Sequence, residues 1–167
     1  MSNRSEQFVF AEVPATVEQL LALPEASLDS PYKTTALALL ALLQYEYNPD
    51  ICFAMLDALR GPSPMSPYDK SFIRDRLMGK PYKVKSFFAG ATPENGYTPN
   101  RPLAITVSSN PYSFDNDNWA TMYVVSSGAD SPRPVKLRLK PSTNQWFIND
   151  IECLSDIRVP ASEDPWA

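Results

Sequence analysis

The sequence predicts a single α+β domain over residues 1–167, with its helices in the first half and an antiparallel sheet in the second. Helix start signals recur in the first half, alternating apolar and polar residues follow, and 44% hydrophobic content is enough for one buried core. We therefore expect about four N-terminal helices packed on a C-terminal four-stranded meander. The predicted parts are a helical region at 14–80, a loop-rich region at 81–102, a sheet at 103–157 and a C-terminal tail at 158–167.

Three Ser-Pro or Asn-Pro pairs have the chemistry of a helix start. Ser30, Asn48 and Ser66 can accept hydrogen bonds from free backbone amides, and the proline that follows each suits the first helical position. Asp69 stands three residues after Ser66, close to a capping box. A Thr-x-x-Gln box precedes a shorter helix. We expect helices at about 17–23, 31–47, 49–60 and 67–78.

The helix predicted at 31–47 is apolar on nearly all sides between Ala36 and Leu43, which predicts a place at the centre of the core. Gly61 and Gly79, with proline just beyond each, are typical helix ends.

The second half has the alternation of half-buried strands. Apolar and polar side chains alternate at 103–108 and 135–140, and aromatic and β-branched residues fill 119–127. A further strand is expected at 145–154, and FVFAEV at 8–13 is a candidate edge strand. The element order is similar to that of cystatin-like or NTF2-like folds, in which a curved sheet wraps a helix.

Composition excludes several function classes. The sequence has no histidine, which removes Ser-His-Asp and Cys-His catalysis and His-based zinc sites. Cys52 and Cys153 lack CxxC spacing and are expected to be buried small hydrophobes. We expect no cofactor and no metal. Whether the protein is an enzyme stays open, with a non-catalytic role favoured.

The distribution of charge limits the classes of partner that the protein is expected to bind. The net charge of −4 is spread evenly along the chain, without the basic patch of nucleic-acid or membrane-surface binding. The longest apolar run, at 36–43, is far shorter than the about 20 residues of a membrane span. We expect a cytoplasmic monomer that binds neither nucleic acid nor membranes.

Several segments together resemble a family of small bacterial proteins that share a domain of unknown function. The segments are GPSPMSPYDKSFIRDRL at 61–77, ATPENGYTP at 91–99, SSGADSPRPVKLR at 126–138 and LSDIRVPASEDPWA, which contains SEDPWA, at 154–167. The resemblance covers nearly the whole chain. It implies a cytoplasmic bacterial module and brings no activity, cofactor or catalytic residue with it.

Two segments carry polar and aromatic chemistry that packing does not require. Ser127, Asp130 and Arg133 lie in a loop that is either an anion or peptide site or a hairpin loop bonded to its own backbone. Trp166, beside acidic residues, is either a docking element or a side chain that packs back on its own domain.

Other candidates have simpler structural explanations. The cluster at 115–118 lacks the glycine and glutamate of a calcium-binding EF-hand and is expected to be a solvated turn. Asp150 and Glu152 are two apart on one strand face, where a solvated face explains them without a catalytic role. Cys153 has no histidine to activate it.

Two functions stay open. The favoured hypothesis is a non-catalytic protein-interaction module that uses the open face of the sheet or the tail. The alternative is a small-ligand binder or enzyme with a pocket between helices and sheet, whose acid–base groups would include Asp150 or Tyr123.

Overall fold

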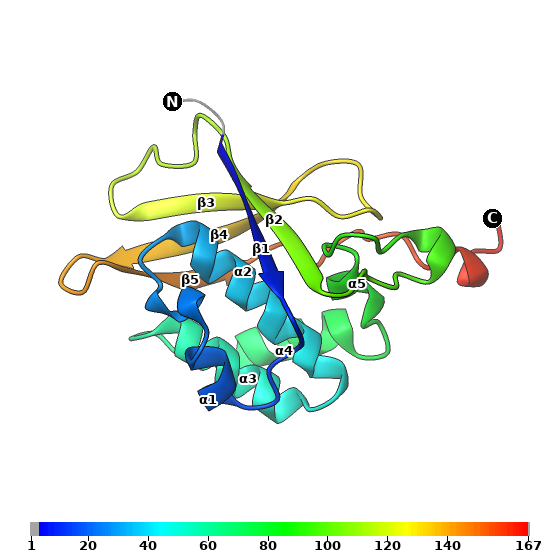
Figure 1. The fold of residues 1–167 in the computed structure, drawn as a ribbon, viewed down its shortest axis with the longest axis horizontal. Helices are drawn as coiled ribbons and strands as arrows, with labels where there is room; N and C mark the ends of the chain where they lie inside the picture. Colours follow the sequence, from blue (N-terminus) through cyan, green and yellow to red (C-terminus); the bar gives the residue numbers. More distant parts are fainter. Residues whose placement is uncertain (1–3, 167) are drawn as a thin grey trace.

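The computed structural model describes residues 4–166 and confirms the α+β class. A five-stranded antiparallel sheet, with its strands in the order β1-β2-β3-β4-β5, packs against the helices (Figure 1). The strands are β1 Arg4–Phe10, β2 Leu103–Ser109, β3 Trp119–Val124, β4 Arg133–Lys140 and β5 Gln145–Ile151. The candidate edge strand at 8–13 therefore exists, but it starts at Arg4 and ends at Phe10.

The helical half follows the predicted order. The α-helices are α1 Val17–Leu21, α2 Pro31–Leu42, α3 Pro49–Arg60, α4 Pro67–Leu77 and α5 Tyr82–Lys85. Short 3₁₀ helices are η1 Pro24–Ser27, η2 Leu43–Glu46, η3 Pro93–Asn95 and η4 Ala161–Glu163. The helix predicted at 31–47 ends at Leu42 and tightens into η2, and the four-residue α5 was not predicted.

The helix starts are where the sequence places them. Ser30 and Asn48 each accept a backbone hydrogen bond from the first turn, at 3.1 and 3.2 Å. Ser66 and Asp69 form a reciprocal capping box, with bonds of 3.1 and 2.9 Å. Gly61 and Gly79 have φ angles of +61° and +69°, positive values that glycine adopts readily and that are expected where these helices end.

Helix α2 is the centre of the core. All of its residues except Lys33 are buried, and it contacts α3 on one side and strands β2, β3 and β5 on the other. Figure 1 shows α2 lying against the sheet with α3 beyond it. The buried residues of the sheet include Ile105, Val107, Met122, Val124 and Leu137. Its apolar surface is thus enclosed on all sides, as the sequence predicts.

Across residues 4–166, no helix is both long enough and apolar enough to span a membrane.

Candidate functional site

Residues 126–133, which comprise most of the loop that joins β3 to β4 and the first residue of β4, are held by bonds within the protein. The Ser126 hydroxyl lies 2.6 Å from the Ser86 hydroxyl and accepts a hydrogen bond from the Gly128 N–H at 3.0 Å. The Ser127 N–H donates to the Ser86 carbonyl at 3.0 Å. The hydroxyls and amides that suggest an anion site in the sequence therefore already form hydrogen bonds, either within the loop or with Ser86.

Residues 126–133, which we call the clasp, also bind the segment that leads to the C-terminus. We call residues 156–166 the C-terminal segment. The Gly128 carbonyl accepts from the Arg158 N–H at 2.9 Å, and the Arg158 guanidinium pairs with Asp130 at 2.9 Å. A side chain on Gly128 would meet the Tyr97 hydroxyl and, at 2.9 Å, the Ile157 side chain. The close approach of the two segments thus requires glycine at this position.

Arg133 also bonds to this segment. Its guanidinium donates to the Ser131 hydroxyl at 3.2 Å and to the Asp156 carbonyl at 3.1 Å. Within the described part of the chain, its Nε is buried without a hydrogen-bond partner. Of the three loop residues singled out in the sequence, Asp130 and Arg133 therefore contact the C-terminal segment, and Ser127 contacts the end of α5.

Tyr97 completes the attachment beside Gly128. Its side chain is fully buried and stacks on Tyr82 with ring centroids 5.5 Å apart, and its hydroxyl donates to the Arg158 carbonyl at 2.6 Å. Burial raises the pKa of Tyr97 and of Tyr82 above the usual value of 10.0. Tyr97 consequently stays protonated at neutral pH and can donate this bond.

Beyond this attachment the chain presents Trp166 to solvent. Ile157 and Pro160 are buried and η4 contacts η3, whereas Trp166 is 93% exposed. The Trp166 N–H donates to the Asp164 carboxylate at 2.8 Å, which fixes the local turn. Figure 1 shows this end of the chain projecting at the opposite end of the molecule from the β4–β5 hairpin. Trp166 does not pack on its own domain.

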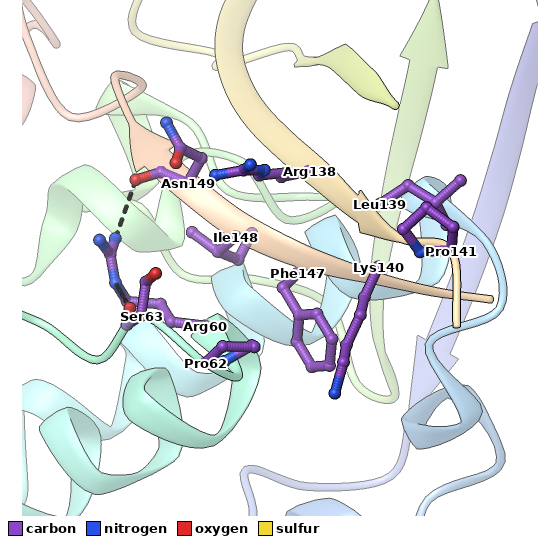
Figure 2. Close-up of a pocket in the computed structure, with 10 residues that line it drawn as sticks. All are labelled: Arg60, Pro62, Ser63, Arg138, Leu139, Lys140, Pro141, Phe147, Ile148 and Asn149. Atoms are coloured by element: carbon purple, nitrogen blue, oxygen red, sulfur yellow. Dashed lines mark hydrogen bonds between the residues drawn. The ribbon is translucent and has the colours of Figure 1, made fainter. Parts of the chain in front are cut away.

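A second site lies at that opposite end, between the loop after α3 and the β4–β5 hairpin. It is an open hollow of about 310 Å³, and we call it the hairpin groove (Figure 2). In Figure 2 the Phe147 ring and the Lys140 side chain lie side by side, with Pro62 across from them. A hollow of this size is at the lower end of the range for ligand pockets, about 300–1,000 Å³.

The three cations that line the hairpin groove differ in their partners. Arg60 donates to the Asn149 carbonyl at 2.9 Å and to the Ser63 carbonyl at 3.0 Å, so it ties the edge of β5 to the helices. Arg138 lies over the Trp119 ring at 5.1 Å. Neither Arg138 nor Lys140 has a salt-bridge partner among residues 4–166. Among the described residues, the groove therefore offers two positive charges without a carboxylate partner, beside an apolar surface.

The carboxylates considered as an acid–base pair line a neighbouring hollow of about 190 Å³ between α4 and β5. Glu152 forms an ion pair with Lys136 at 3.6 Å, and Asp150 accepts a hydrogen bond from Asn149 at 3.1 Å. Tyr123, the other group considered, lies on β3 and lines neither hollow.

The remaining candidates have the surroundings expected of structural residues. Cys52 and Cys153 are buried free thiols, and burial raises the pKa of each to about 12. Residues 115–118 form an exposed turn before β3. In the part of the chain that the structure describes, no three His, Cys, Asp or Glu side chains are grouped to hold a metal ion.

Sequence reasoning missed the hairpin groove because its wall comes from three separate elements. The alternation in β4 places Arg138 and Lys140 on a solvated face, which is the only local signal. The contact between Phe147 and the loop after α3 depends on how β5 lies against Gly61. At Gly61 there is no room for a side chain beside the Phe147 ring.

The fold and these two sites define a small α+β domain with a projecting acidic and aromatic segment at one end and a cationic groove at the other. The chain belongs to the family described as domain of unknown function DUF6935, whose model matches residues 12–161. This confirms the resemblance in the sequence. No curated protein and no solved structure matches the chain, so the similarity to cystatin-like or NTF2-like folds stays an expectation about element order.

Proposed function

We propose that this domain is a non-catalytic protein-interaction module of the bacterial cytoplasm, and that Trp166 on its acidic segment is the contact it offers to a partner protein. The single observation that carries the proposal is the exposure of Trp166, 93%, on a segment whose base is fixed by the clasp and Tyr97. Tryptophan is enriched among the residues that dominate binding energy at interfaces. A fixed base also lowers the entropy lost when the segment binds.

The cytoplasmic location belongs to the same proposal. It is supported by the likeness to small bacterial proteins and by the two free cysteines, which suit a reducing compartment.

Partner capture with Trp166→Ala tests the proposal. Because Trp166 makes little contact with its own domain, the variant should keep the wild-type fold and lose a partner that the wild type captures from cells carrying the gene. Tyr112→Ala is the matched control, since Tyr112 is also a highly exposed aromatic, at 74%. Equal capture by wild type and Trp166→Ala would reject Trp166 as the contact.

The hairpin groove supports a second candidate function, the binding of a small anionic ligand with an apolar part. Arg138 and Lys140 are available to pair with a carboxylate or phosphate, and Phe147 supplies the apolar contact. A thermal-shift screen of aromatic carboxylates and phosphates tests this. A hit that persists in Lys140→Ala would place the ligand elsewhere.

A further inference from the structure

The sheet has two edges, and at the edge formed by β5 other parts of the protein form hydrogen bonds with the backbone of the strand. The Trp146 N–H donates to the Leu28 carbonyl at 2.7 Å, and the Trp146 carbonyl accepts from the Thr34 hydroxyl at 2.8 Å. Arg60 donates to the Asn149 carbonyl at 2.9 Å. Because an edge with free backbone groups is a template for pairing with another chain, these contacts protect β5.

Among residues 4–166, nothing covers the edge formed by β1 in this way. All seven residues of β1 pair with β2, and the Ala104 carbonyl of β2 bonds to the Ala89 N–H on the side away from β1, at 2.8 Å. Backbone groups alternate in direction along an antiparallel strand. The residues of β1 whose N–H and C=O groups point outward are therefore Ser5, Gln7 and Val9, and none of these groups bonds to a residue in the described part of the chain.

The outward residues also lack the features that usually discourage pairing. None of them is charged or proline, and all three are exposed, Val9 at 55%. The two charged residues of β1, Arg4 and Glu6, pair with each other at 2.9 Å, and Arg4 also lies over the Tyr32 ring at 4.9 Å.

We propose that a second copy of this chain occupies this edge, with the two β1 strands antiparallel about a two-fold axis at Gln7. In this register Gln7 lies opposite Gln7 of the second copy, and Ser5 lies opposite Val9. Each outward N–H and C=O then gains one partner, and the two sheets become continuous. Such a self-complementary contact is typical of a two-fold dimer.

The side chains agree with this register. Arg4 lies opposite Phe10 of the second copy and Glu6 lies opposite Phe8, so no like charges are directly opposed. A shift of two residues in either direction moves an outward residue beyond the end of the described strand. The register at Gln7 is thus the one that uses all the free backbone groups.

This dimer goes beyond the proposed function, because the clasp, Trp166 and the hairpin groove all lie outside β1. It differs from the monomer expected from the sequence, and sedimentation decides between the two.

Analytical ultracentrifugation of the full chain over a concentration series gives the first test, with the wild type expected to reach the dimer mass. Gln7→Pro removes the outward N–H without touching the bonds to β2, since proline is tolerated at an edge that faces solvent. It should weaken the dimer roughly thirtyfold, through loss of the two central hydrogen bonds. Gln7→Thr, the matched control, should still dimerise.

A charge exchange tests the register itself and does not depend on proline being accommodated. Gln7→Lys and Gln7→Glu each place like charges opposite one another across the axis, so each alone should dimerise roughly fivefold more weakly. Mixed in equal amounts, they should form a heterodimer that native mass spectrometry finds in excess over the 1:2:1 ratio that random pairing gives. A monomer at every concentration would overturn the proposal. So would a dimer that Gln7→Pro leaves intact, or a mixture with no heterodimer excess.

Discussion

Replacing Tyr97 by phenylalanine removes one hydroxyl from the attachment of the C-terminal segment and leaves the ring in place. The hydroxyl donates to the Arg158 carbonyl at 2.6 Å from a fully buried side chain. The variant loses this hydrogen bond and leaves a carbonyl without its donor. The free energy of unfolding should fall by about 1–3 kcal/mol. For a domain of this size, each kcal/mol lost lowers the Tm by about 2–4 °C.

Denaturant unfolding followed by circular dichroism measures this loss. The matched control is Tyr112→Phe, because Tyr112 is 74% exposed and its hydroxyl makes no hydrogen bond to residues 4–166, so its removal should change stability by less than about 0.5 kcal/mol. If Tyr97→Phe is as stable as the wild type, Tyr97 does not hold the segment and the proposed attachment is wrong.

The same tyrosine gives a pH dependence with a definite sign. The folded protein holds the phenol proton of Tyr97 more tightly than the unfolded chain, because burial raises the pKa above the usual 10.0. This stabilisation is complete below the unfolded pKa and is lost as the pH rises toward the folded pKa. Wild-type stability should therefore fall above about pH 10, and the fall should be smaller in Tyr97→Phe.

Three other predictions concern the core, the thiols and the wall of the groove. Leu39→Ala and Leu40→Ala should each lower the free energy of unfolding by about 2–5 kcal/mol in denaturant titrations, because both side chains are fully buried in α2. Cys52 and Cys153 should resist a thiol reagent until the protein is unfolded, because burial raises their pKa to about 12; fast labelling of the folded protein would contradict this. Gly61→Ala should lower stability by about 1–3 kcal/mol in the same titrations, because its φ is +61° and the new methyl group would lie 2.7 Å from the Phe147 ring.

The helical half of the fold was predictable because its signals are local. A cap such as Ser66 and its partner Asp69 are three residues apart, so the sequence alone places the start of α4. The strands of the second half were predictable for a similar reason, since alternation over a few residues reveals a half-buried strand. Strand β1 was misplaced because its first residues, RSEQ, are polar and mostly exposed at the sheet edge.

The sites depend on contacts between distant residues, which the sequence does not show. The sequence shows Asp130 and Arg133 as polar residues between two strands, but their partners, Arg158 and Asp156, lie more than twenty residues along the chain. The same limit applies to the hairpin groove, where Lys140 and Phe147 come from adjacent strands and the opposite wall comes from the loop after α3.

We propose that Trp166 is exposed for a partner, whereas the clasp and Tyr97 hold the C-terminal segment as part of the fold. The free energy of unfolding of Trp166→Ala, measured in denaturant beside the wild type, tests this claim most directly. We predict a difference below about 0.5 kcal/mol, as for a surface substitution. A loss of about 3–5 kcal/mol, typical of truncating a buried aromatic side chain, would contradict the claim and make Trp166 part of the core.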